Sequence, residues 1–342
     1  MSDLAARLFT ALAAEPGNLA LSPHSVAVAL GLAAYGARGA TRDEIQAVVG
    51  GEGRPVDAGS EVELSSASRL FGQRELTWQP DLADLLTEVD YADLEAARGV
   101  INSWTSERTH GRIPEIVPTG VLDEETLLVL VNALYLKAAW LDPFQEGATA
   151  DADFHLADGA TVPVPTMRQV LGAPTGAGPG WRSARLRYVG GTLAMTVVLP
   201  EPGRLPDLEA AVAAHGWGHL LEAPGAERLE LHLPRFTVRS ASRLTGVLAG
   251  LGMPTAFTDD ADFSGFTTSE PLKISEVLHQ VFVDVDEEGT EAAAATAIAM
   301  QRAGGMPAPP VPFVVDRPFL FAIHHVASGA LLFVGRMADP RS

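Results

Sequence analysis

The chain has 342 residues, of which 47% are hydrophobic and 20% charged, a composition typical of globular proteins that excludes a disordered or collagen-like chain. Its 24 basic and 43 acidic residues give a net charge of -19, which repels phosphate backbones, anionic membranes and sulfated sugars, so we expect no nucleic acid, membrane or heparin partner. The sequence contains no cysteine, which excludes disulfides, thiolate metal sites and thiol nucleophiles.

The first 50 residues predict three helices. Apolar residues recur at helical spacing over residues 4–15, 23–36 and 41–49. Ser22, followed by a proline, is typical of a helix N-cap and first turn. Thr41 and Glu44 have the spacing of a capping box, so we expect the third helix to begin there. With an acid at Asp3 and no basic start before an apolar stretch, no signal peptide is expected, and the chain is expected to be cytoplasmic or a secreted mature form.

The middle of the chain changes from helical to strand-like patterns. Glycine, proline and acids over residues 50–61 indicate a loop, and a strand is predicted at 65–72. Residues 80–107 return to helical composition. The continuous apolar run Leu127–Val131 is typical of a strand covered on both faces, which indicates the centre of a sheet.

Short strand-like runs dominate from residue 152 onward. They include residues 194–199, 229–233 and 281–285, and one helical segment, 241–252, interrupts them. Helices early and strands late, without regular alternation or internal repeats, predict an α+β fold. No linker-like segment divides the chain, so we expect a single domain over residues 1–342.

A search for catalytic and metal-binding motifs gives little. The sequence has no nucleophile elbow, phosphate-binding loop or zinc-binding helix motif. His215 and His219 have the spacing of helical metal ligands, but the glycines between them weaken any helix. His324 and His325 are neighbours on a probable strand and point to opposite faces. We therefore expect no enzymatic activity, no metal site and no cofactor.

The alanine-rich segment after residue 285 has two interpretations. On propensity alone residues 291–300 would form a helix, because alanine is the strongest helix former. The segment directly follows the apolar run 281–285, however, and leads into Gly304-Gly305 and prolines between residues 307 and 312. That placement favours an exposed, extended loop, and the residues alone leave both interpretations open.

Further motifs are spread along nearly the whole chain. They are Asn18-x-x-x-Ser22-Pro23-x-Ser25, residues 36–45, Ile101-Asn102-Ser103-Trp104 with Gly111-Arg112-Ile113, residues 130–137, Trp140 with Pro143-Phe144, Pro234-Arg235-Phe236, residues 272–275, Leu278-His279, residues 287–292, and Arg317-Pro318-Phe319-Leu320-Phe321 through Gly335-Arg336. In content and order they resemble the serpins, a family of serine protease inhibitors, here of the inhibitory, prokaryotic type. The resemblance implies an α+β serpin fold, with mostly N-terminal helices packed on a large central mixed sheet, smaller antiparallel sheets and an exposed reactive-centre loop at about residues 287–316.

The resemblance also implies two structural sites beneath this loop. A polar cluster under the centre of the main sheet, the shutter, would consist of Ser22, Ser25, Asn132 and His279. Trp140 would lie at the breach, where the loop enters the sheet. Glu287 corresponds to the acid at the loop base, and Arg235 to a basic residue that can meet it. If exposed, this pair contributes at most about 1 kcal/mol.

The loop itself is implied to act as an insertion strand. Its hinge would comprise Glu287, Glu288, Gly289, Thr290, Glu291, Ala292, Ala293, Ala294 and Ala295. Side chains alternate along a strand, so Thr290, Ala292, Ala294, Thr296 and Ile298 would share one face. The small residues near the hinge lower the steric cost of entering between two strands.

Counting along the family pattern places the cleaved bond fourteen residues beyond Gly289, between Ala303 and Gly304, with Arg302–Ala303 as the alternative. Ala303 favours an elastase-like or subtilisin-like target, Arg302 a trypsin-like one, and a chymotrypsin-like protease is a further alternative.

The implied function is irreversible suicide inhibition by a metastable monomer. A non-inhibitory serpin that acts as a chaperone or carrier is the alternative. The short stretch between residues 49 and 65 leaves no room for the helix of heparin-activated members.

Overall fold

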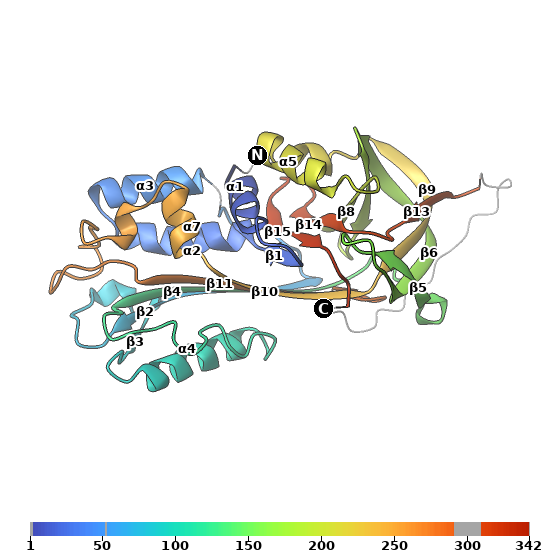
Figure 1. Ribbon diagram of the computed structural model, residues 1–342. Helices are drawn as coiled ribbons and strands as arrows, with labels where there is room; N and C mark the ends of the chain where they lie inside the picture. Colours follow the sequence, from blue (N-terminus) through green and yellow to red (C-terminus); the bar gives the residue numbers. More distant parts are fainter. Residues whose placement is uncertain (1–2, 52, 291–308, 342) are drawn as a thin grey trace.

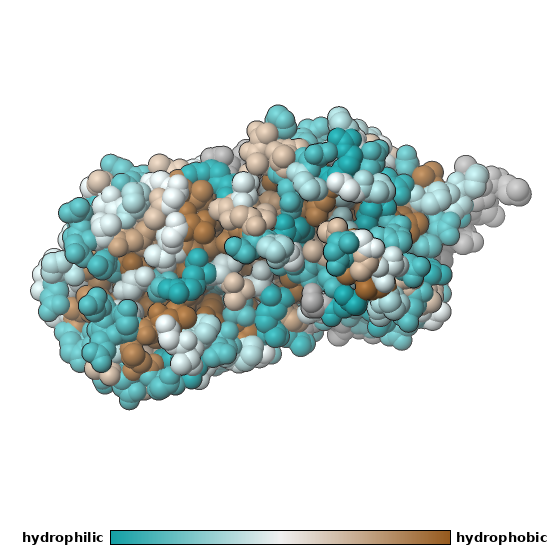
Figure 2. All heavy atoms as spheres, in the orientation of Figure 1, coloured by the Kyte–Doolittle hydropathy of each residue, from teal (hydrophilic) through white to brown (hydrophobic). Residues whose placement is uncertain are grey.

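A computed structural model of the chain describes residues 3–51, 53–290 and 309–341. Its helices are α1 (Asp3–Leu12), α2 (Pro23–Gly36), α3 (Gly39–Val49), α4 (Leu94–Arg108), α5 (Leu205–His215), α6 (Gly218–Leu221) and α7 (Thr245–Gly250), with short 3-10 turns at Pro80–Leu82, Glu146–Ala148 and Thr255–Phe257. Within the described ranges, none of these helices is long and apolar enough to cross a membrane. On the face drawn in Figure 2, hydrophilic residues predominate and apolar patches lie between them.

The N-terminal helices form largely as predicted, with one error at a helix start. Ser22 caps α2, because its Oγ accepts a hydrogen bond from the backbone N–H of Ser25. The capping box predicted for the third helix is wrong: α3 begins at Gly39, and its N-cap Arg38 makes no side-chain cap bond. The two side chains concerned contact a distant segment instead, since Thr41 accepts from the N–H of Asp262 and Glu44 from the N–H and hydroxyl of Thr255.

Two other segments predicted as helical are only partly so. Residues 80–107 contain a 3-10 turn, then the strand β3 (Leu86–Val89), and only then α4. β3 forms because it pairs in parallel with β2 (Val62–Gln73), a long-range contact that outweighs local propensity. In the 241–252 segment, the first residues extend strand β10 and only Thr245–Gly250 are helical.

The first of two sheets has six strands in the order β10-β11-β12-β4-β2-β3. The remaining strands are β4 (Leu128–Ala139), β10 (Phe236–Arg243), β11 (Glu276–Val285) and β12 (Gly289–Thr290). β4 is buried over nearly its whole length, which confirms the central strand predicted from its apolar run. The sheet is mixed, with β11 parallel to β4 and antiparallel to β10. α4 covers one face, and α1, α2 and α3 lie on the other side (Figure 1).

A second, nine-stranded sheet forms the other half of the molecule (Figure 1). Its strands are β1 (Leu19–Leu21), β5 (Ala150–His155), β6 (Thr161–Gly178), β7 (Trp181–Arg187), β8 (Leu193–Pro200), β9 (Gly225–Pro234), β13 (Val311–Val314), β14 (Phe319–His325) and β15 (Leu331–Met337). The antiparallel pairs expected as smaller sheets are joined here because the 18-residue strand β6 pairs with β5, β7 and β9. One apolar core contains inward residues of both sheets, including Phe236, Val283, Phe321 and Phe333.

Candidate functional site

Ser22, Ser25, Asn132 and His279 lie together between α2 and the six-stranded sheet, and each is at most 1% exposed. The backbone N–H of Ser22 donates to Nε2 of His279 over 3.0 Å, so the ring proton lies on Nδ1. This Nδ1–H donates to Oδ1 of Asn132 over 2.6 Å, and the Ser25 hydroxyl donates to the same oxygen over 2.7 Å. The amide nitrogen of Asn132 donates to the carbonyl of Ser25 over 3.0 Å. Each of the four residues therefore has a hydrogen-bond partner among the other three.

Sheet register explains why these side chains meet. His279 of β11 lies opposite Asn132 of β4, and Asn132 lies opposite Ser68 of β2. The Asn132 amide donates to the Ser68 hydroxyl over 2.8 Å, so the polar cluster has a fifth member that the sequence did not identify. Burial lowers the pKa of His279 to about 4, and the ring is therefore neutral at physiological pH. The polar cluster of these five residues joins three adjacent strands to α2.

The loop base, residues 286–290, begins where β11 ends. Gly289 and Thr290 form the short strand β12, with Gly289 opposite Ala139 and Thr290 opposite Ala138 of β4. Thr290 also lies opposite Val285 of β11, so β12 fits between the ends of the two strands. A Cβ on residue 289 would lie 2.1 Å from the carbonyl oxygen of Ala138, which only glycine avoids. Backbone proximity therefore requires glycine at this point.

Trp140 holds the loop base against the body of the protein. Its indole Nε1 donates to the carbonyl of Asp286 over 2.9 Å, and its backbone N–H to the carbonyl of Glu288 over 2.8 Å. The indole stacks on Tyr188 with ring centroids 4.5 Å apart. The Tyr188 hydroxyl lies 2.7 Å from Oγ1 of Thr290, which is completely buried. Trp140 thus contacts the loop base directly, and its role as a breach residue stays a prediction.

Glu287 and Arg235 meet, and the acidic side chain of the pair is buried. Nε and Nη2 of Arg235 donate to Oε1 of Glu287 over 2.7 Å and 2.6 Å, and the Thr149 hydroxyl donates to the same oxygen. The Glu287 side chain is 4% exposed and that of Arg235 is 44% exposed. Burial alone would raise the pKa of Glu287, yet the hydrogen bonds from Arg235 and Thr149 outweigh it and the pKa is lowered. The limit of about 1 kcal/mol was stated for an exposed pair only, and this pair does not meet that condition because the Glu287 carboxylate is buried.

Comparison with known proteins identifies the family of this chain. The family model for "Serpin (serine protease inhibitor)" matches residues 1–340. The chain is a serpin. It is 35% identical to the leukocyte elastase inhibitor of Bos taurus, over 95% of this chain and 93% of that protein. It is 34% identical to Serpin-Z1C of Triticum aestivum, over 98% of this chain and 94% of that protein.

Solved structures show the same fold. Serpin48 of Tenebrio molitor, described as a highly specific serpin, is 29% identical, has a TM-score of 0.86 and matches over 98% of this chain and 94% of that chain. Uncleaved ovalbumin is 25% identical, with a TM-score of 0.85 over 99% and 98% of the two chains. The animal and plant relatives named here give no support to the prokaryotic type expected from the sequence.

In this serpin the strands on either side of the loop base are paired with each other. β11 and β4 are in register from Glu276 opposite Val129 to Phe282 opposite Tyr135. Only β12 lies between them among the described residues. The rest of the predicted hinge and both candidate cleavage sites lie outside the described residues: Glu291, Ala292, Ala293, Ala294, Ala295, Arg302, Ala303 and Gly304.

The histidine pairs of the serpin make separate contacts. The rings of His215 and His219 are 5.8 Å apart between centroids, and no group of three or more metal-ligating side chains occurs in the described part of the chain. Nε2 of His324 lies 3.0 Å from the Thr196 hydroxyl, whereas Nδ1 of His325 lies 2.8 Å from the Ser328 hydroxyl. The two neighbouring histidines thus bond in different places, as strand alternation predicts.

Proposed function

We propose that this serpin is an irreversible suicide-substrate inhibitor of serine proteases, cleaved between Ala303 and Gly304, or alternatively between Arg302 and Ala303. The observation that carries the proposal is the loop base. Its last two residues, Gly289–Thr290, already lie between the ends of β4 and β11, while the rest of these strands pair with each other. A cleaved loop can therefore extend β12 by parting one pair of strands.

The register of β12 supports this path of entry. Thr290 lies opposite Ala138 and Val285, and each further residue of an antiparallel strand faces one residue earlier in both neighbours. Six residues beyond Thr290, Thr296 would lie opposite Asn132 and His279, the two residues whose hydrogen bond must break when the strands part. A hydroxyl both donates and accepts, so Thr296 can replace the lost partner of each side chain.

The proposed chemistry is that of an interrupted hydrolysis. The protease serine attacks the carbonyl carbon of Ala303, an ester forms, and the amine of Gly304 leaves with the serine proton. Insertion of residues 290–303 would then move the attached protease about 45–48 Å, at about 3.3–3.4 Å per residue, before water reaches the ester. Ala303 fits the small pocket of an elastase-like or subtilisin-like protease, and the name of the Bos taurus relative agrees with an elastase.

We further propose that the inhibitor acts as a monomer with one serpin domain over residues 1–342, in the cytoplasm or as a secreted mature form. The net charge of -19 supports action without nucleic acid, membrane or heparin. The lack of recognisable catalytic motifs in the sequence agrees with a protein that is not an enzyme.

The test is incubation of the full chain with equimolar pancreatic elastase, subtilisin, chymotrypsin and trypsin. We expect a complex with elastase or subtilisin that survives denaturing electrophoresis, together with a released peptide that begins at Gly304 by mass spectrometry. A peptide that begins at Ala303, with trypsin in the complex, would select the alternative bond. Cleavage in the loop without any stable complex would refute inhibition and favour a chaperone or carrier.

A further inference from the structure

Residues 110–112, which follow α4, contact both sides of the line along which β4 and β11 would separate. Tyr135 of β4 lies opposite Phe282 of β11, and both side chains belong to the apolar cluster that the sheet shares with α4. By the register of β12, a loop that enters the sheet would place Ala293 between these two residues. The contacts of this segment are therefore met early in loop entry, three residues beyond Thr290.

One end of the segment is attached to β2 and β4. Nε2 of His110 lies 2.8 Å from Oε1 of Glu63 on β2, and the His110 ring lies 6.0 Å from the Tyr135 ring between centroids. His110 has a φ of 50°, the only positive value at a residue other than glycine in the described part of the chain, and Gly111 follows with a φ of 77°. A histidine keeps this unfavourable conformation only where its surroundings fix it.

The other end of the segment is attached to β10 and β11. The guanidinium carbons of Arg112 and Arg239 lie 5.8 Å and 5.3 Å from the centroid of the Phe282 ring, so two cations contact one aromatic side chain. Arg239 lies opposite Phe282 on β10, and its Nη2 donates to the carbonyl of Arg112 over 3.2 Å. Arg112 also acts across the line, because burial raises the pKa of Tyr135 and the charge of Arg112 opposes that rise.

Insertion of a strand is incompatible with this arrangement. Neighbouring strands lie about 4.8 Å apart, so a new strand moves Tyr135 away from Phe282 by about that distance. His110 and Arg112 have one residue between them, which limits their Cα atoms to about 7 Å apart even when the chain is extended. A cation contacts a ring only within about 6 Å of its centroid. The segment therefore loses its contacts on one side when the strands part.

We propose that residues 110–112 form a bridge that restrains the separation of β4 and β11 and so sets the rate of loop entry. Arg112 is its main positioning residue, because it contacts Phe282 on one strand and acts on Tyr135 on the other. The role of the bridge in inhibition rests on the proposed function. The restraint itself acts in the uncleaved protein and is measurable without a protease.

The test measures how fast a synthetic peptide of residues 291–303 enters the uncleaved full chain. The one acid and one base of the peptide cancel, and the peptide leaves the place of β12 free. We expect Arg112→Met to raise the rate constant for formation of the one-to-one complex at least about fivefold over wild type, followed by native gel electrophoresis. An unchanged rate, or no entry of the peptide into either protein, would overturn the bridge.

A second arginine near the bridge gives a matched control. Arg108 lies at the end of α4, four residues before Arg112, and its side chain is exposed. Arg108→Met removes the same charge outside the bridge and should change the rate of peptide entry less than about twofold. Equal increases in Arg108→Met and Arg112→Met would mean that the loss of charge alone speeds entry, which contradicts the bridge.

A double-mutant cycle separates the bridge from a general loss of stability. Phe282→Leu removes the ring that both guanidiniums contact and should raise the rate about as much as Arg112→Met. Adding Arg112→Met to Phe282→Leu should then change the rate less than about twofold, whereas independent destabilisation would multiply the two increases and refute the bridge. If Phe282→Leu does not fold, the exposed Arg239→Met takes its place in the cycle.

The peptide measurement distinguishes this inference from the proposed function. Faster peptide entry into Arg112→Met would support the bridge even if the wild type formed no stable complex with any protease, a result that refutes inhibition alone. Stable protease complexes together with equal peptide rates in wild type and Arg112→Met would support inhibition and overturn the bridge.

Discussion

Asn132 is the residue on which the polar cluster depends most. It bonds to Ser25, Ser68 and His279 at once. We predict that Asn132→Leu, which keeps the volume and removes the amide, lowers the free energy of unfolding by about 4 kcal/mol, because several buried groups lose their partners and each costs about 1–3 kcal/mol. Urea unfolding measures this loss.

A serine on the same strand provides the control for Asn132→Leu. Ser66 lies two residues before Ser68 on the same face of β2 and makes no side-chain hydrogen bond among the described residues. Ser66→Ala should change the free energy of unfolding by less than about 1 kcal/mol. If Asn132→Leu costs no more than Ser66→Ala, the polar cluster does not stabilise this sheet.

His279 should make stability depend on pH. Its pKa is about 4 in the folded protein and 6.5 for the free side chain, so between these values the unfolded state binds a proton that the folded state does not. Stability therefore falls as pH drops from 6.5 to 4, by at most about 3 kcal/mol, since one pKa unit corresponds to about 1.4 kcal/mol. The difference between wild type and His279→Gln in urea unfolding at pH 7 and pH 4.5 measures this effect.

The His279→Gln comparison has an internal control. Burial also lowers the pKa of His324 to about 4, but that residue is present in both proteins and cancels in the difference. Equal pH dependence in wild type and His279→Gln would show that His279 does not cause the acid sensitivity.

For single residues, the sequence identified which side chains belong to the polar cluster better than it identified the residues that contact them. Ser22, Ser25, Asn132 and His279 were predicted together because the family motifs carry them, and they do meet. Ser68 was missed because a serine in a strand is informative only once its register with Asn132 is known. The burial of Glu287 was left open for a similar reason, since its carboxylate accepts a hydrogen bond from Thr149 in a distant segment.

Among the elements, β12 is the one from which the loop would enter the sheet under the proposed mechanism. Thr290 is completely buried between β4 and β11, and its hydroxyl meets Tyr188. We predict that Thr290→Arg converts the inhibitor into a substrate, because a buried charge slows insertion and deacylation then wins. The number of inhibitor molecules consumed per protease inhibited, measured by titration with elastase or subtilisin, should rise at least about tenfold.

The neighbouring residue gives a matched control for Thr290→Arg. Glu291 follows Thr290 directly and, by strand alternation, would point to the opposite face on insertion. Glu291→Arg should therefore change the stoichiometry less than about twofold. Loss of inhibition in both variants would mean that charge near the hinge, and not burial at position 290, blocks the reaction.

Element boundaries were the weakest part of the sequence prediction. Continuous apolar runs located β4 and β11 well, because a strand buried on both faces has that pattern wherever it pairs. The start of α3 and the strand β3 were missed for a different reason. Thr41 and Glu44 bond to residues 255–262, and β3 exists through its pairing with β2, so in both cases partners distant in sequence determine the local structure.

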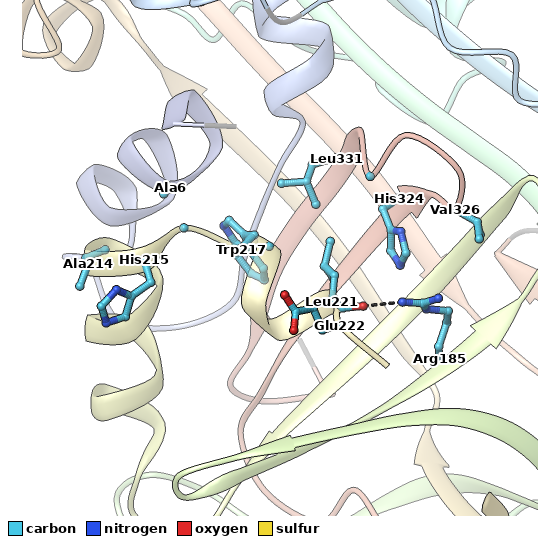
Figure 3. Close-up of a pocket in the computed structure, with 14 residues that line it drawn as sticks. Ala6, Arg185, Ala214, His215, Trp217, Leu221, Glu222, His324, Val326 and Leu331 are labelled. Atoms are coloured by element: carbon cyan, nitrogen blue, oxygen red, sulfur yellow. Dashed lines mark hydrogen bonds between the residues drawn. The ribbon is translucent and has the colours of Figure 1, made fainter. Parts of the chain in front are cut away.

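For the whole molecule, the α+β class and the mixed central sheet were predictable, whereas the joining of the other strands into one nine-stranded sheet was not. β6 makes that connection through three strands that lie on both sides of it in sequence, and a strand pattern alone does not specify its partners. The same limit applies to the hollow shown in Figure 3, because the side chains that line it, among them Ala6, Arg185, Trp217 and His324, come from four separate parts of the chain.

The paired state of β4 and β11 leads to a prediction about the stability of the whole molecule. Cleavage near Ala303 frees the loop, and residues 290–303 can then form hydrogen-bond ladders with both strands in exchange for the single ladder between them. The cleaved protein should therefore unfold at a temperature at least about 10 °C higher, since a gain of several kcal/mol shifts the midpoint of a chain of this size by about 2–4 °C per kcal/mol. Calorimetry before and after nicking with a catalytic amount of protease measures the shift.

A blocked variant separates insertion from the effect of cutting the chain. Thr290→Arg keeps the same cleavable bond but opposes burial of the strand, so its nicked form should gain less than half of the wild-type increase in midpoint. An unchanged midpoint after wild-type cleavage would refute a metastable starting state. An equal rise of the unfolding midpoint in both proteins would mean that cutting the chain is itself stabilising. A new strand between β4 and β11 would then not account for the stabilisation.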